Sequence, residues 1–171
     1  EAFQVLAENW NTISNDVEMI QTEGIDAVRV VEPAYKVVKK NDDLVEVQDG
    51  IKGRILPFEL VQSVKFTAEL NVIAEKEARM VEIDTLLDEV RDSFNEDEQS
   101  AYLDDDDNTK LDKKAITADA KKKGDEIEAE TKAKLKSIIA YWDEQKKLNK
   151  VVKEERIALI QLTKEAIENL K

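Results

Sequence analysis

Cysteine and histidine are both absent from this chain of 171 residues. Without cysteine, disulfide bonds, thiolate metal sites and thiol nucleophiles are excluded. Without histidine, the commonest general base and zinc ligand is missing. Glycine occurs four times, proline twice, and aromatic residues make up only 5% of the chain. Any catalytic chemistry must therefore come from carboxylates, lysines, tyrosines or the backbone.

Long apolar runs are missing as well. No stretch approaches the roughly 20 apolar residues that span a bilayer, and no charged-then-apolar leader opens the sequence. We therefore predict a cytoplasmic chain with no membrane partner. Because Glu1 already lies within a helical pattern, we expect the sequence to be a piece of a longer protein.

Charge is abundant, with 38% charged residues and a formal net charge of −13. Residues 82–107 hold twelve acidic side chains against one basic, a net −11, whereas residues 108–171 hold 16 basic and 12 acidic, a net +4. Nucleic-acid affinity rests on Lys and Arg that neutralise phosphates, so nucleic-acid binding by the chain as a whole is disfavoured. A local contact remains open for four lysines: Lys146, Lys147, Lys150 and Lys153.

The N-terminal part predicts a small α+β cap over residues 1–62. Apolar side chains at three- and four-residue spacing indicate an amphipathic helix over residues 3–20, and Gly24 lies where a helix C-cap favours glycine. Short β-branched runs then predict a hairpin and a third strand. The predicted strands are 35–39, 44–48 and 51–56.

Residues 63–171 predict a long antiparallel helical hairpin or coiled coil, so the fold class is mainly α. Pro57 favours the first turn of a helix, and the helical pattern runs from there to about Glu98, with a break near Ser63. Its apolar seam recurs every seven residues, at Phe66, Ile73, Met80, Leu87 and Phe94, with Leu70, Ile83 and Val90 beside it. The later segments are an acidic loop at about 95–110, a short helix at 111–123 and a final helix from 125 to the end.

The final helix is predicted to be on the order of 65–70 Å long. Isolated helices are marginal in water and are stabilised by packing an apolar face, so it folds back against the first long helix and overhangs it. The overhang predicts a partner interface, and packing of the same residues on the 66–94 seam is the alternative. The exposed stripe also favours self-association of the isolated chain. The predicted partner-facing residues are Trp142, Leu148, Val152, Leu159 and Leu162.

The acidic segments do not predict a catalytic, cofactor or metal site. Asp104–Asp107 superficially suggests a calcium loop, but Thr109 stands where the sharp turn needs Gly and Ala115 where a bidentate Glu is needed. Carboxylates on the 82–98 helix lack a pocket that would separate their pKa values for acid–base chemistry. A solvated helix face explains them better.

Several segments together resemble the C-terminal helical region of the modification (M) subunit of type I restriction-modification DNA methyltransferases. The residues 53–62, Gly-Arg-Ile-Leu-Pro-Phe-Glu-Leu-Val-Gln, are the most specific part. The segments are Trp10, 15–20, 23–26, 48–50, 53–62 and 162–170.

The resemblance implies a role in assembly. In that family a catalytic domain binds S-adenosylmethionine and methylates adenine N6 with an Asn-Pro-Pro-aromatic motif. This chain has only Pro33 and Pro57, so no Pro-Pro pair exists and no enzyme activity or cofactor is expected in this fragment. The resemblance implies docking on the DNA-specificity (S) subunit, together with a second M subunit, so contact with DNA is expected only indirectly, through the complex.

Two alternatives remain. One is a free-standing coiled-coil scaffold with no connection to methyltransferases. The other is a helical DNA clamp that uses the basic final helix, which predicts salt-dependent binding to duplex DNA.

Overall fold

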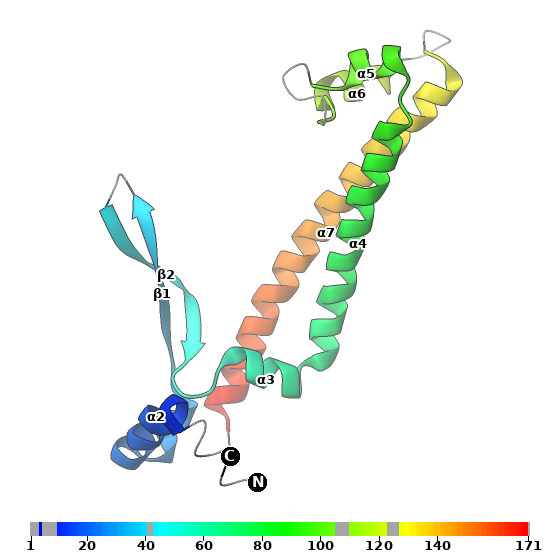
Figure 1. The fold of residues 1–171 in the computed structure, drawn as a ribbon. Helices are drawn as coiled ribbons and strands as arrows, with labels where there is room; N and C mark the ends of the chain where they lie inside the picture. Colours follow the sequence, from blue (N-terminus) through cyan, green and yellow to red (C-terminus); the bar gives the residue numbers. More distant parts are fainter. Residues whose placement is uncertain (1–3, 5–9, 41–42, 105–109, 123–126, 171) are drawn as a thin grey trace. The chain divides into compact units, whose positions relative to one another are not determined.

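A computed structural model describes the chain as mainly α-helical with an antiparallel β-hairpin, as the sequence predicts (Figure 1). Two compact units are present: a first unit of residues 1–71 with 156–171, and a second unit of residues 72–155. The predicted division into 1–62 and 63–171 stays a prediction. The structure describes residues 4, 10–40, 43–104, 110–122 and 127–170.

The secondary-structure elements follow one another in a simple order. Helix α2 and the 3₁₀ turn η1 precede the hairpin, and the named elements of the described chain after it are helices. No described helix is both long enough and apolar enough to cross a membrane. The bounds are α2 Trp10–Glu23, η1 Ile25–Arg29, β1 Val31–Lys40, β2 Asp43–Gly53, α3 Phe58–Lys65, α4 Thr67–Asp92, α5 Glu96–Tyr102, α6 Lys113–Asp119 and α7 Ala129–Glu168.

Gly24 ends α2 as predicted. Its φ of 83° lies in the left-handed region that glycine adopts without a Cβ penalty, and its N–H donates to the carbonyl of Ile20 at 2.9 Å. The predicted first helix began at residue 3, and most residues before Trp10 lie outside the described part. The helix and its glycine C-cap are therefore confirmed from Trp10 onward.

The hairpin is confirmed but longer than predicted, and the third strand is wrong. Ile51 pairs with Pro33, so the residues assigned to a third strand begin as the end of β2. Between the Pro33–Ile51 pair and the Tyr35–Gln48 pair, two residues of β2, Asp49 and Gly50, lie opposite the single residue Ala34 of β1. This register shift is a β-bulge. Gly50 has a φ of 88°, and this left-handed residue lets β2 continue past the bulge.

The seven-residue seam forms the buried side of α4, as predicted. Ile73 and Ile83 are 5% and 0% exposed, and Phe66, Leu70, Met80, Leu87 and Val90 are half-buried. The break before this helix comes at Phe66, between α3 and α4, rather than near Ser63. Knobs-into-holes packing of a coiled coil remains a prediction.

Within the second unit, α4 and α7 lie side by side and antiparallel (Figure 1). Polar contacts join them, and the Arg79 guanidinium binds both carboxylate oxygens of Glu144, at 2.8 and 3.1 Å. This hydrogen bonding, followed by that to Glu82, raises the pKa of Arg79, and it lowers the pKa of Glu144. The contacts fix the pairing of the helices, although such part-exposed ion pairs contribute only about 0.2–1 kcal/mol each. The contacts are the ion pairs Lys76–Glu155 and Arg79–Glu144 and a hydrogen bond from the Gln145 side-chain amide to Asp84.

The acidic segment after α4 is not simply a loop, and this prediction is wrong for residues 96–102. Asn95 accepts a hydrogen bond from the Glu98 N–H at 2.8 Å, and Glu98 accepts one from the Asn95 N–H at 2.9 Å. This capping box starts α5. The predicted short helix at 111–123 is confirmed as α6, and residues 105–109 lie outside the described part.

A small hydrophobic core holds α5 and α6 on α7. Phe94 and Tyr102 contact each other with ring centroids 5.8 Å apart, and Ile116 of α6 is fully buried beside them. The Tyr102 hydroxyl donates to Asp119 at 3.2 Å. Apolar burial therefore explains why this acidic stretch folds. The core residues are Phe94, Tyr102, Ile116, Leu135 and Ile138.

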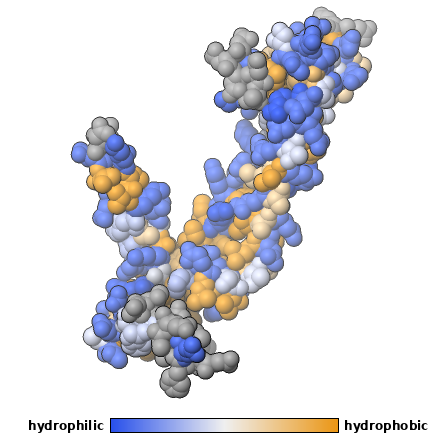
Figure 2. All heavy atoms as spheres, viewed as in Figure 1, coloured by the Kyte–Doolittle hydropathy of each residue, from blue (hydrophilic) through white to orange (hydrophobic). Residues whose placement is uncertain are grey.

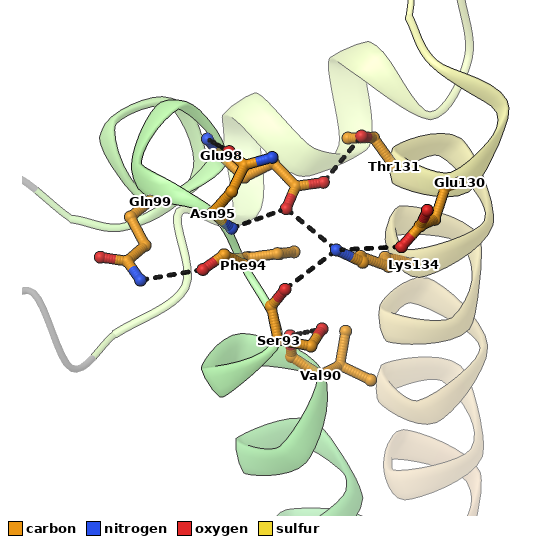
Figure 3. A network of polar contacts seen from close by, with 9 residues as sticks. All are labelled: Val90, Ser93, Phe94, Asn95, Glu98, Gln99, Glu130, Thr131 and Lys134. Atoms are coloured by element: carbon orange, nitrogen blue, oxygen red, sulfur yellow. Dashed lines mark hydrogen bonds and ion pairs between the residues drawn. The ribbon is translucent and has the colours of Figure 1, made fainter.

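Glu98 lies buried between α5 and α7 in a network of polar contacts (Figure 3). Its carboxylate accepts from the Thr131 hydroxyl at 2.7 Å and from the Lys134 ammonium at 3.0 Å. Lys134 also donates to the carbonyl of Ser93 at 3.0 Å. Glu98 thus completes the capping box of α5 and also joins that helix to α7.

Burial raises the pKa of Glu98, but hydrogen bonds from Thr131, the Asn95 backbone and Lys134 outweigh it. The folded chain therefore has a Glu98 pKa below the ordinary value of 4.5. A group with a lowered pKa stabilises the fold above its ordinary pKa. That contribution is lost as the pH falls through the folded value.

We predict that Glu98→Gln lowers the free energy of unfolding by about 1–3 kcal/mol at neutral pH, because the amide removes the charge that Lys134 faces. The deficit should shrink as the pH falls below 4.5, since Glu98 in the parent chain then takes up a proton. Urea unfolding at neutral and acid pH measures both effects. Glu96→Gln, an exposed site in α5, is the control. A deficit equal to the control's, or one that does not change with pH, would contradict this role.

Candidate partner-docking site

The five predicted partner-facing residues do not share one exposed face. Val152 and Leu159 are 7% and 4% exposed, so the folded chain already covers most of both side chains, and their role as partner contacts stays a prediction. Trp142 and Leu148 are half-buried. Leu162 is 40% exposed and remains available. The burial of Val152 and Leu159 favours the alternative that these two positions pack within the chain.

The buried stripe of α7 continues through two residues that the sequence pattern did not select. Thr163 and Ile167 are both 0% exposed and follow Leu159 at four-residue steps. The Thr163 hydroxyl donates to the Leu159 carbonyl at 2.6 Å and accepts from the Gln62 side-chain amide at 3.1 Å. A polar residue on the apolar stripe is therefore satisfied, and its burial turns Leu162 toward solvent.

The Gln62–Thr163 hydrogen bond lies beside a shallow apolar groove in the first unit. We call it the α3–α7 groove. Its volume is about 170 Å³, and Figure 2 shows hydrophobic side chains gathered over α3 and the adjoining end of α7. Apart from Lys65, every lining residue is apolar. The lining is Leu56, Leu60, Val61, Val64 and Lys65 on one side and Ala166, Ile167 and Leu170 on the other.

The sequence of α3 explains why the groove is open. Phe58 in the first turn is buried at 8% exposure. Leu60 and Val64 are four residues apart and share a helix face, yet they are 52% and 73% exposed. An eight-residue helix with two large apolar side chains in water leaves a face that a partner can cover.

The turn that leads into α3 depends on a glycine. A Cβ added at Gly53 would lie 2.0 Å from the Leu56 carbonyl oxygen and 3.3 Å from Cδ1 of Ile167. No side chain fits there unless the backbone moves. Gly53 therefore allows the strand end, the turn and the end of α7 to approach one another closely.

Arg54 joins the same turn to the start of the unit. Its backbone N–H donates to the Val30 carbonyl at 2.9 Å, and its guanidinium contacts Glu23 at 2.7 Å and Glu32 at 3.4 Å. Hydrogen bonds from Lys52 and then Arg54 lower the pKa of Glu32 against the opposing effect of burial. The segments 23–26, 53–62 and 162–170, which carry the sequence resemblance, thus meet within one unit.

The described residues offer no group of three or more carboxylates that could hold a metal ion. Comparison with known proteins gave no further guide, since no family model, curated protein or solved structure matches the chain. The lining of the α3–α7 groove is apolar, with one cationic residue, Lys65.

We predict that Gly53→Ala destabilises the chain more than Gly50→Ala. Gly50 has a left-handed φ but no atom within 4 Å of a built Cβ, so alanine there costs about 1–2 kcal/mol from backbone strain alone. At Gly53 the new methyl group meets a backbone oxygen that moves only with the turn. Denaturant unfolding of both variants gives the comparison. If Gly53→Ala were the milder change, the close approach would not constrain the turn.

Proposed function

We propose that the chain is a non-catalytic assembly region of a type I restriction-modification adenine-N6 DNA methyltransferase, the C-terminal helical region of its modification subunit. In this proposal it docks on the DNA-specificity subunit. The observation that carries the proposal is the α3–α7 groove. Two of the segments that carry the resemblance, 53–62 and 162–170, supply most of its lining.

The groove suits an amphipathic helix of the partner. Helices dock in apolar grooves through side chains at i, i+3, i+4 and i+7, and the family's specificity subunit offers long helices. Leu60 and Val64 would be covered by such a helix, and Leu162 is a further exposed apolar residue on the same end of α7. Lys65 at the rim favours a partner with an acidic residue beside its apolar stripe.

The proposal places methyl transfer outside this segment. The S-adenosylmethionine site and the Asn-Pro-Pro-aromatic motif would lie elsewhere in the parent polypeptide, in the cytoplasm. A second modification subunit would join through the complex. Sequencing the gene upstream of Glu1 is a direct check, because the proposal requires that motif in the same reading frame.

The docking surface can be tested with two matched valines. Val64 in α3 is 73% exposed and Val81 in α4 is 66% exposed, so Glu at either position should leave the fold stable. We predict that Val64→Glu weakens binding to the specificity subunit encoded in the same genome by at least about tenfold, or 1.4 kcal/mol. The reason is that the carboxylate must be desolvated beneath the partner helix. Isothermal titration of the purified chain measures the affinity.

Val81→Glu is the control and should bind like the parent chain. If the parent chain does not bind the specificity subunit, or if both variants bind equally well, the proposal is wrong. Self-association of the chain that Val64→Glu abolishes, without any binding of a specificity subunit, would instead support the free-standing scaffold.

A further inference from the structure

The second unit carries an open groove of a different kind, between α6 and the middle of α7. Its volume is about 930 Å³. Four lysines line it: Lys113 from α6, and Lys146, Lys150 and Lys153 from α7. We call it the lysine groove. Its residues all belong to the second unit, whereas the α3–α7 groove belongs to the first.

The positive charge of the lysine groove stands out in a chain of net charge −13. Asp143 is the carboxylate in its lining, and Asp84 lies at its edge, where it accepts a hydrogen bond from Gln145 at 2.6 Å. Lys150 is 3.8 Å from Glu154, with both side chains largely exposed. Among the described residues, Lys113, Lys146 and Lys153 make no ion pair. Their charges are therefore available to an anionic ligand.

The lysines of α7 lie on one face of the helix. Lys146, Lys150 and Lys153 follow the i, i+4, i+7 spacing of a helical stripe, and together they extend roughly 10 Å along the axis. One strand of duplex DNA places a phosphate about every 3.4 Å of axis. The row therefore extends over about three phosphate-to-phosphate steps of one strand.

An aromatic ring completes the groove. Trp142 is half-buried in the lining, and the Lys113 ammonium lies 5.2 Å from its ring centroid. Lysines beside an aromatic surface are the combination that nucleic-acid-binding proteins use for backbone and base or sugar contacts. The acidic groups of a peptide would satisfy the lysines alone, whereas every nucleotide also offers a sugar and a base that can pack on the ring.

We propose that the lysine groove binds the phosphodiester backbone of a nucleic acid. Lys146, Lys150 and Lys153 contact phosphates along α7, Lys113 contacts the strand from α6, and Trp142 packs against a sugar or base. This is a direct contact made by this chain, separate from any DNA contact made through a partner subunit. It does not depend on the α3–α7 groove.

The test is fluorescence anisotropy of a labelled short duplex, and of its single strand, titrated with the full chain over a series of salt concentrations. Four phosphate contacts predict that log K falls against log salt with a slope of about −3.6 on duplex and about −2.8 on single strand. Lys146→Gln should reduce the duplex slope by about 0.9 and weaken binding at every salt concentration. The two probes show which form of nucleic acid is preferred.

Lys147→Gln is the matched control, because it removes the same charge from the next residue, which does not line the groove. Trp142→Phe should weaken binding without changing the salt slope. Val64→Glu should have no effect, which separates this proposal from docking at the α3–α7 groove. Absence of binding at low salt, equal losses in Lys146→Gln and Lys147→Gln, or tighter binding of polyglutamate than of either nucleic acid would each overturn the proposal.

Discussion

The stability of α7 depends on how its apolar stripe is covered. At 40 residues this helix is about 60 Å long, and most of its stability must come from packing because isolated helices are marginal in water. Leu135 and Ile138 are covered in the core with α5 and α6. Farther along, Thr163 bonds to Gln62 and Ile167 lies near Gly53. Helix α7 is therefore packed by α5 and α6 near its start and by the segment 53–62 near its end.

The packing in each unit determines which surfaces stay exposed to solvent. In the second unit, Ile116 of α6 is buried in the core, and Lys113 of the same helix lies beside Trp142. In the first unit, α3 buries Phe58 but leaves Leu60 and Val64 exposed. One surface is apolar and the other cationic, so they suit different partners. The two proposed contacts are thus chemically independent although both involve α7.

Periodicity predicted the elements that repeat a simple pattern. The seam at Ile73 and Ile83, the hairpin and the long final helix follow from apolar spacing and β-branched runs. Residues 96–102 were missed because their helix depends on a capping box and on the burial of Tyr102, and an acidic composition hides both. The buried stripe of α7 includes Thr163, a polar residue that apolar spacing does not select. Its hydroxyl can be buried because it forms hydrogen bonds with the Leu159 carbonyl and the Gln62 side chain. The groove was missed because its two sides lie far apart in sequence, although both had been singled out for their resemblance.

Hydrogen exchange of the isolated chain, resolved by mass spectrometry, tests most directly whether the chain itself holds α7 along its length. The account predicts that amides of residues 159–167 exchange nearly as slowly as those of residues 135–138, because both stretches are buried by intramolecular packing. Exchange of 159–167 at the rate of an unfolded peptide, with 135–138 still protected, would contradict it. The end of α7 would then need a partner to fold, and the α3–α7 groove would not exist in the free chain.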